Sequence, residues 1–130
     1  MNLILSEEEL KKLPRPIRKE PKVIPKIIHF GPGAFFRSFV ATLINDVNQK
    51  DVENWGIIAV SLHSGDTFNK LAGQDFVFNA LSTSNTQKRI QKISSISDFL
   101  VAEKDRKSVL DALSDEQIDI VSLTITEKGY

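Results

Sequence analysis

The apolar residues of this chain follow two different periods. Three short runs are rich in β-branched residues and read as strands, at Lys26–Phe30, Gly56–Leu62 and Ile118–Ile125. Between the first two, apolar residues recur at helical spacing over Phe36–Val47, which predicts a helix lying on a sheet. Its predicted inner stripe is Phe36, Phe39, Val40, Leu43, Ile44 and Val47, and its predicted outer face carries Asn45, Asp46, Gln49 and Lys50.

This alternation predicts an α/β fold with a mostly parallel sheet and flanking helices. The run Gly56–Leu62 is apolar at nearly every position, which is typical of a strand in the middle of a parallel sheet, and the run Ile118–Ile125 is likewise predicted to be a buried strand. A further helix is expected over Asp66–Ala72, started by Ser64 or Asp66, and another over Lys104–Leu113 with Val109, Leu110 and Leu113 facing inward. Two runs at 76–81 and 89–93, joined by a polar turn, predict a β-hairpin inserted into this pattern.

The first 25 residues form a separate stretch before residues 26–130. Ser6 and Glu9 have the spacing of a capping box, which predicts a short helix that ends before Pro14. Residues 14–25 are rich in proline and charge. This arm either attracts anions or is a solvated linker draped over the domain, and the second interpretation is favoured because charge runs are usually solvated.

Composition narrows the possible functions. The 130 residues hold 17 basic and 17 acidic side chains, and this balance argues against a nucleic-acid-binding protein. There is no cysteine, so disulfides and thiolate chemistry are excluded. The two histidines, His29 and His63, lie in separate runs, which predicts structural or partner-binding roles rather than metal ligation. No signal peptide or membrane-spanning run is visible, so a cytoplasmic location and no membrane partner are expected.

A glycine turn follows the first predicted strand. Gly31 can make a tight turn, Gly33 lets the backbone approach a ligand, and Pro32 stiffens the turn between them. The amides of Gly33, Ala34 and Phe35 open the next helix and are predicted to face a dinucleotide pyrophosphate. The complete Gly-x-Gly-x-x-Gly fingerprint has a third glycine where this chain has Phe36, which indicates a looser crossing or an outward-turned ring. On spacing alone, a nucleotide site and an ordinary glycine turn remain alternatives.

The end of the second strand is where a dinucleotide's adenosine ribose is usually held, by an acidic residue. Here the chain reads Leu62-His63-Ser64-Gly65-Asp66, so Ser64 stands where the acid is expected and Asp66 comes two residues later. A hydroxyl and an imidazole tolerate a ribose phosphate better than a carboxylate does. Ser64 and Asp66 are therefore candidate cofactor residues, and NAD and NADP both remain open.

Three stretches together resemble one family. They are the strand–turn–helix from His29 to Arg37, the run from Trp55 to Leu62, and the closing run Val121-Ser122-Leu123-Thr124-Ile125-Thr126-Glu127-Lys128-Gly129-Tyr130. In order and spacing the chain resembles the N-terminal Rossmann domain of the mannitol dehydrogenase family, the long-chain polyol dehydrogenases and hexuronate reductases. It departs from the family pattern at Phe36 and Phe39, where members often have histidine.

The resemblance implies roles for further residues. Arg37 matches a family arginine and either approaches the pyrophosphate or is a surface arginine. Thr124 and Thr126 are expected on the nicotinamide side, and Glu127 and Lys128 on the substrate side. The resemblance places the catalytic lysine in a C-terminal helical domain beyond residue 130, so this chain is expected to hold no catalytic residue of its own.

Two functions follow. In the first, the chain is the incomplete cofactor domain of an oxidoreductase that moves a hydride between NAD(P) and a polyol or sugar acid, of the mannitol/fructose or fructuronate/tagaturonate type. Alone it is then expected to be inactive and to self-associate through exposed apolar surface. In the second, it is a stand-alone nucleotide-binding or interaction module that catalyses nothing.

Overall fold

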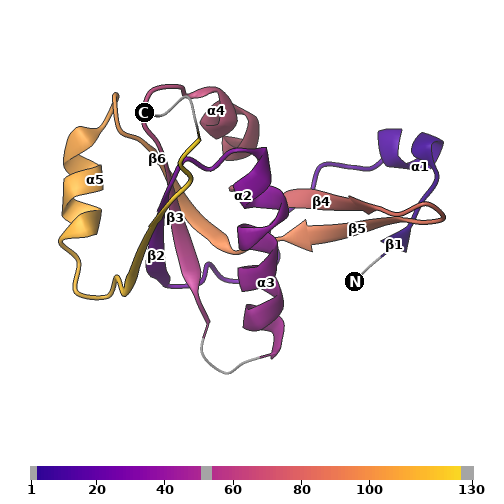
Figure 1. Cartoon of the computed structure of the whole chain (residues 1–130), viewed down its shortest axis with the longest axis horizontal. Helices are drawn as coiled ribbons and strands as arrows, with labels where there is room; N and C mark the ends of the chain where they lie inside the picture. The colour runs from indigo at the N-terminus through magenta and orange to yellow at the C-terminus, as the bar shows by residue number, and fades with distance from the viewer. Residues whose placement is uncertain (1–2, 51–53, 127–130) are drawn as a thin grey trace.

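A four-stranded parallel sheet forms the centre of the molecule in the computed structural model, which describes residues 3–50 and 54–126. Its order is β6 (Ile96–Val101), β3 (Gly56–Ser61), β2 (Pro25–Phe30) and β7 (Ile120–Leu123). Figure 1 labels β6, β3 and β2 at the centre of the molecule. All three strand pairs are parallel. The predicted parallel sheet is confirmed, although the last strand is shorter than the predicted run.

Helices cover both faces of this sheet. On one face lie α2 (Ala34–Ser38), α3 (Val40–Lys50) and α4 (Asp66–Ala72), and on the other lies α5 (Arg106–Leu113) (Figure 1). Consecutive parallel strands need a crossover: α2 and α3 connect β2 to β3, and α5 connects β6 to β7, whereas α4 leads into the hairpin that precedes β6. The chain reverses direction across the sheet after β6, so β2 and β7 meet at the switch point where α/β folds bind ligands.

The predicted hairpin is also confirmed. It consists of β4 (Phe78–Thr83) and β5 (Lys88–Ile93), which pair antiparallel and project from the rest of the molecule (Figure 1). The first strand begins two residues later than predicted. A short strand β1 (Leu3–Ile4) pairs with β5 and makes a second sheet. The helix α1 (Glu7–Lys11) follows with the predicted capping box on Ser6.

The strand β6, at one edge of the parallel sheet, was not predicted from the sequence. Polar residues interrupt its apolar pattern, yet two of them are buried. The hydroxyl of Ser95, just before the strand, donates to the carbonyl of Ala41 at 2.8 Å, and that of Ser97 donates to the carbonyl of Val23. These hydrogen bonds permit burial of serine hydroxyls that the residue pattern assigns to the surface.

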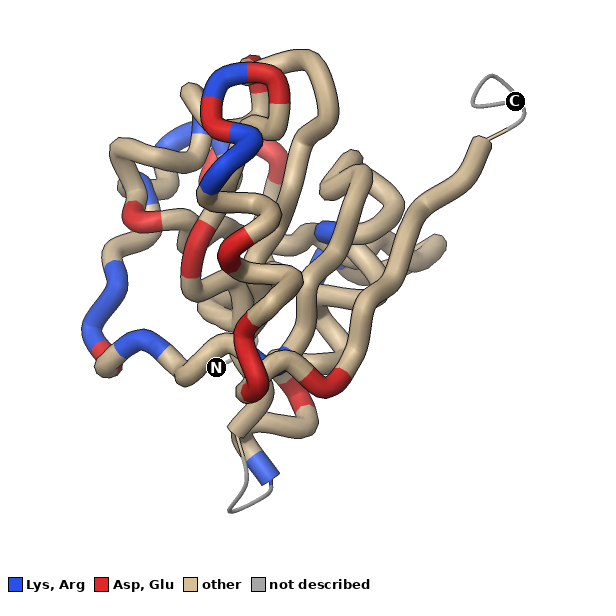
Figure 2. The backbone as a smooth tube through the Cα atoms, turned by 90° about the vertical axis from the view of Figure 1, so that its left-hand side faces the viewer, with Lys and Arg blue, Asp and Glu red and all other residues tan. Residues whose placement is uncertain are grey.

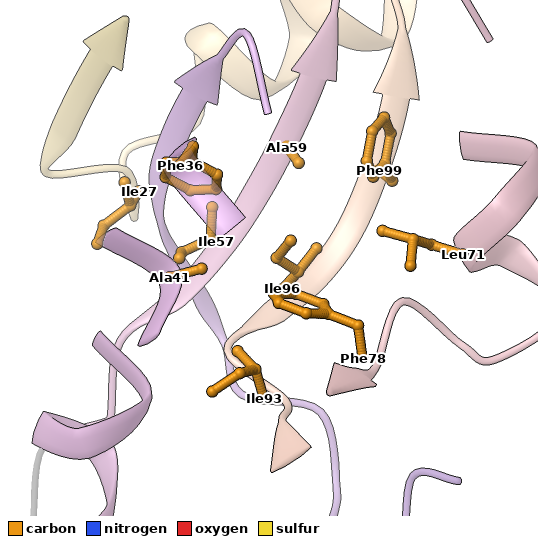
Figure 3. Close-up of a cluster of buried hydrophobic side chains, with 10 residues drawn as sticks. All are labelled: Ile27, Phe36, Ala41, Ile57, Ala59, Leu71, Phe78, Ile93, Ile96 and Phe99. Carbon is orange, nitrogen blue, oxygen red and sulfur yellow. The ribbon is translucent and has the colours of Figure 1, made fainter. Parts of the chain in front are cut away.

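Two layers of apolar side chains hold the sheet and helices together. Residues of β2 and β3 alternate between the two faces: Ile27 and Ile57 pack under α2 and α3, whereas Ile28 and Ile58 pack under α5. Figure 3 shows the larger cluster, which comprises Ile27, Phe36, Ala41, Ile57, Ala59, Leu71, Phe78, Ile93, Ile96 and Phe99.

The single predicted helix over Phe36–Val47 is two helices, and its inner face was partly wrong. The helical path breaks at Phe39, whose φ is −116° and ψ −72°. The break rotates α3, so Phe39, Leu43 and Val47 are exposed whereas Asn45 is only 3% exposed. The side-chain oxygen Oδ1 of Asn45 accepts a hydrogen bond from the backbone N–H of Ser94 at 2.9 Å. This bond explains how the polar side chain of Asn45 is tolerated in the interior.

A second correction concerns the open side of the sheet. Val109 of α5 is buried as predicted, but Leu110 and Leu113 are exposed. The run 118–125 was predicted to be buried, yet its strand β7 lies at the edge of the sheet. Exposed apolar side chains on this side are Leu110, Leu113, Ile120, Val121, Leu123 and Ile125.

The proline-rich arm is fastened to the domain rather than fully solvated. The Arg18 side chain is 7% exposed and donates to the Asp75 carboxylate at 3.0 Å and to the carbonyl of Ile96 at 2.7 Å. Lys22 pairs with the same Asp75 at 2.8 Å, and hydrogen bonding by Lys22 is the main reason that the pKa of Asp75 lies below its usual value. The division into an arm (1–25) and a domain (26–130) stays a prediction.

Candidate functional site

The glycine turn links the end of β2 to the start of α2 at the carboxyl edge of the sheet. Gly31 has a φ of +88°, a conformation that favours glycine, and its amide donates to the carbonyl of Val60 at 3.0 Å. The Gly33 amide donates back to the carbonyl of Gly31 at 2.8 Å. The prediction that the Gly33 amide is free for a ligand was therefore wrong, because the turn around Pro32 uses it. The amides of Ala34 and Phe35 remain as the first-turn donors that a helix cannot satisfy internally.

The two glycines of the turn have different surroundings. A Cβ atom added to Gly31 would lie 3.3 Å from the carbonyl oxygen of Thr124, so the turn packs closely against the chain after β7. A Cβ atom added to Gly33 meets nothing within 4 Å. The absence of a side chain at Gly33 therefore leaves open space in front of the helix start, as the predicted close approach of a phosphate requires.

Beneath the turn, Phe36 points into the core and packs on the ring of His29. The two rings are 3.6 Å apart with an interplanar angle of 7°, and Phe36 is 1% exposed. Of the two predicted alternatives, the outward-turned ring is wrong, because the ring faces inward and the flat imidazole gives it a stacking partner. A looser crossing of helix and strand, at the place where a third glycine usually lets them approach, stays a prediction.

His29 also joins β2 to the segment at β7. Its Nδ1 lies 2.7 Å from the Ser122 hydroxyl, and its Nε2 lies 2.9 Å from the Thr124 hydroxyl. The ring is 3% exposed, and burial lowers its pKa from the usual 6.5, so the neutral form is favoured. The pattern of residues around His29 predicted no specific role for it, because its partners Ser122 and Thr124 lie more than 90 residues away in sequence.

The end of β3 carries the second group of predicted cofactor residues. Ser64 and Asp66 are both exposed, and the Ser64 hydroxyl accepts the amide of Asp66 at 3.2 Å. The helix α4 begins at Asp66 with Gly65 as its N-cap, so its predicted bounds are confirmed. His63 faces Glu103, with Nδ1 and Oε2 4.0 Å apart.

An apolar groove lies beside this loop, where β2, β3 and β6 end and α5 begins. Its lining residues are Phe30, Leu62, His63, Ala102, Glu103, Arg106, Val109, Leu110 and Leu113. The glycine turn, the loop containing Ser64 and this groove therefore all adjoin the carboxyl ends of the parallel strands.

The remaining predicted residues have separate positions. Arg37 is half-buried, and its Nε lies 3.4 Å from the carbonyl of Gly33, so its side chain folds back along α2. The hydroxyl of Thr124 is engaged by His29, whereas Thr126 is exposed. Glu127 and Lys128 lie outside the described residues. The ligand contacts proposed for all of these residues stay predictions.

The surface carries mixed charge. Figure 2 shows basic and acidic residues interspersed along the backbone, including the segment that enters α5.

Within residues 3–50 and 54–126, no three histidine, aspartate or glutamate side chains gather closely enough to hold a metal ion. In the same part of the chain, no helix combines the length and apolarity needed to cross a membrane.

The structure has the parts of a dinucleotide-binding domain. They are a parallel sheet, a reversal of strand order at β2, and a glycine turn that follows this strand. Comparison with protein families gives a match over residues 25–130 to the mannitol dehydrogenase Rossmann domain. The chain belongs to the mannitol dehydrogenase family. This confirms the resemblance inferred from the three motif stretches.

Individual relatives agree with this assignment. The polyol:NADP oxidoreductase of Gluconobacter oxydans is 34% identical over 98% of this chain and 28% of its own length. Mannitol 2-dehydrogenase of Pseudomonas fluorescens, solved as a ternary complex with NAD and D-mannitol, is 34% identical with a TM-score of 0.76; 97% of this chain and 27% of that one are covered. A D-sorbitol dehydrogenase solved without substrate is 32% identical with a TM-score of 0.75, over 97% and 28%. The chain thus spans just over a quarter of the length of these relatives.

Proposed function

We propose that this chain is the cofactor-binding part of an oxidoreductase that transfers a hydride between NAD(P) and a polyol or sugar acid. The observation that carries the proposal is the turn from β2 to α2, where Gly33 borders open space at the switch point of the sheet. One relative is named as a polyol:NADP oxidoreductase, and another was solved as a complex with NAD. Both support a dinucleotide as the ligand.

The residues present fit such a ligand. The first-turn amides of Ala34 and Phe35 are the donors that we assign to the pyrophosphate, and Gly33 has no side chain to obstruct it. Gly31 and His29 hold the turn against the segment at Thr124, so the donors are fixed before the ligand arrives. The apolar groove beside Leu62 offers a surface for the adenine ring.

The bound nicotinamide supplies or accepts the hydride, and a general base must exchange the proton of the substrate hydroxyl. In our proposal that base belongs to a part of the protein outside residues 3–126, in keeping with the greater length of the relatives. Polyols of the mannitol type and hexuronates such as fructuronate and tagaturonate are the substrate classes to test.

The experiment uses the whole protein encoded by the gene. Oxidation of NADH and NADPH is followed with fructose, fructuronate and tagaturonate, and the dissociation constant of each cofactor is measured by titration. We expect turnover with at least one pair. The absence of both cofactor binding and turnover contradicts the proposal and leaves the non-catalytic interaction module as the better account.

Gly33→Ala tests the turn itself. The open space at Gly33 predicts an unchanged fold, whereas the added methyl group occupies the path of the phosphate and weakens dinucleotide binding by about tenfold or more. Gly73→Ala is the control. Gly73 is exposed, its φ is −66°, and a Cβ atom added there would meet only the Arg15 guanidinium, at 3.8 Å, so alanine fits without strain. Equal cofactor affinity in both variants contradicts the role given to Gly33.

The exposed apolar residues of β7 and of α3 are proposed to be covered by the rest of the protein. Isolated as residues 1–130, the chain is then expected to self-associate through them and to show no turnover. Sedimentation velocity over a concentration series tests this, and a monomer at all concentrations contradicts it.

A further inference from the structure

The chain segments that follow β3 and β6 run side by side beyond the sheet. The amide of Ala102 donates to the carbonyl of Ser61 at 2.8 Å, and the amide of Glu103 donates to the carbonyl of Leu62 at 3.2 Å. The parallel pairing therefore continues past the last strand residues. It brings Lys104 next to the loop of residues 63–65.

The backbone at Lys104 is fixed by a turn. Its amide and that of Asp105 both donate to the carbonyl of Val101, at 3.1 and 3.0 Å. The side chain reaches across to the loop after β3, because a Cβ atom added to Gly65 would lie 3.1 Å from the Lys104 Nζ and 3.8 Å from the Asn69 Nδ2. The ammonium group therefore lies against the residue that separates Ser64 from α4.

The two carboxylates that flank Lys104 in sequence have other partners. Glu103 faces His63, and Asp105 caps α5 by accepting the amide of Ser108 at 3.0 Å. Within residues 3–50 and 54–126, no carboxylate oxygen lies within 4.0 Å of the Lys104 Nζ. In this part of the chain, the ammonium group has no counter-ion of its own.

Ser64 provides the second contact. Its oxygen already accepts the amide of Asp66 at 3.2 Å, which leaves the hydroxyl proton available for an acceptor outside the loop. Ser64 precedes Gly65, against which the Lys104 ammonium group lies. A hydroxyl donor and an ammonium group on the same loop are suited to a phosphate oxygen, whereas the hydroxyls of an unphosphorylated ribose are better held by a carboxylate.

We propose that Lys104 and Ser64 bind the 2′-phosphate of the adenosine ribose, so that this protein prefers NADP(H) to NAD(H). The inference rests on the proposed function and assigns a specificity role within the same site. Lys104 comes from the connection between β6 and α5 rather than from the loop that follows the second strand of the dinucleotide unit.

The test is calorimetric titration of the whole protein with 2′,5′-ADP and with 5′-AMP, two probes that differ only in the 2′-phosphate. We expect the wild type to bind 2′,5′-ADP at least about tenfold more tightly. Lys104→Ala should weaken the binding of 2′,5′-ADP by about 10- to 100-fold, as expected for the loss of a charge-assisted hydrogen bond. The affinity of the same variant for 5′-AMP should stay within about twofold of the wild-type value. Ser64→Ala should produce a smaller loss, also confined to 2′,5′-ADP.

Two further variants sharpen the result. Lys107→Ala is the control, because this neighbouring lysine is held along α5 by Asp111 at 2.7 Å and should leave both affinities unchanged. Asp66→Asn tests the opposite assignment, in which a carboxylate holds the ribose hydroxyls, and should leave 5′-AMP binding unchanged.

Each contrary result has a separate meaning. Equal binding of the two probes, an equal loss of both in Lys104→Ala, or no loss in that variant overturns the inference and leaves the proposed function standing. Weaker 5′-AMP binding in Asp66→Asn also overturns it, in favour of NAD. If neither probe binds and neither cofactor is oxidised or reduced, the proposed function fails together with the inference.

Discussion

Phe36→Gly completes the Gly-x-Gly-x-x-Gly fingerprint, and we expect it to destabilise the fold severely. In most dinucleotide-binding turns the third glycine lets helix and strand pack closely. In this chain that position is filled by a ring that stacks on His29 at 3.6 Å and is 1% exposed. Removal of the ring leaves a cavity between α2 and the sheet.

The expected cost has two parts. Truncation of a buried phenylalanine to alanine costs about 3–5 kcal/mol, and glycine in place of alanine within a helix adds about 1 kcal/mol. The sum of about 4–6 kcal/mol is comparable with the whole stability of many domains, about 5–15 kcal/mol.

Urea unfolding measures the loss, followed by far-UV circular dichroism and by fluorescence of Trp55, the single tryptophan. Phe35→Gly is the matched control: Phe35 precedes Phe36 in the same turn of α2 but is 64% exposed. It should lose only about 1 kcal/mol from the helix backbone. If the two variants lose equal stability, the ring of Phe36 does not carry the packing that we assign to it.

Three other predictions concern the scaffold. Gly56→Ala places a methyl group 2.5 Å from the carbonyl of Val23 and should cost about 3 kcal/mol in urea unfolding; a loss below about 0.5 kcal/mol contradicts that contact. Burial lowers the pKa of His29 in the folded state, so the unfolded chain takes up its proton first and stability should decrease as the pH falls below about 6.5. His29→Gln should remove that part of the pH dependence, and an unchanged slope refutes the assignment. Arg18→Ala leaves buried carbonyls without their donor and should cost about 3 kcal/mol, whereas the exposed Arg15→Ala should cost less than about 0.5 kcal/mol; similar losses argue against fastening of the arm by Arg18.

Local signals in the sequence were sufficient for most of the elements. Continuous β-branched runs predicted β2 and β3, and their parallel pairing follows from the helix between them. The capping box at Ser6 and the glycine turn at Gly31 were recognisable because each depends on residues within a few positions. The family motif that begins at Val121 was recognisable for the same reason, because its residues are consecutive in the sequence.

The wrong predictions concern residues whose burial or strand pairing depends on hydrogen-bond partners far away in the sequence. Asn45 was predicted to be on the outer face of a helix, but Ser94 supplies its hydrogen bond and allows its burial. The strand β6 was missed because distant carbonyls, those of Ala41 and Val23, satisfy the hydroxyls of Ser95 just before the strand and Ser97 within it. No residue pattern within one element reveals such partners.

The candidate site divides in the same way. The sequence by itself determined the turn, the helix start and the absence of an acid at Ser64, since these are properties of neighbouring residues. Only the tertiary structure showed that the Gly33 amide is already used, that Phe36 stacks on His29, and that Lys104 reaches the loop after β3. Each of these depends on segments that meet only when the sheet forms, because hydrogen bonds and stacking act over a few ångströms between residues far apart in the chain.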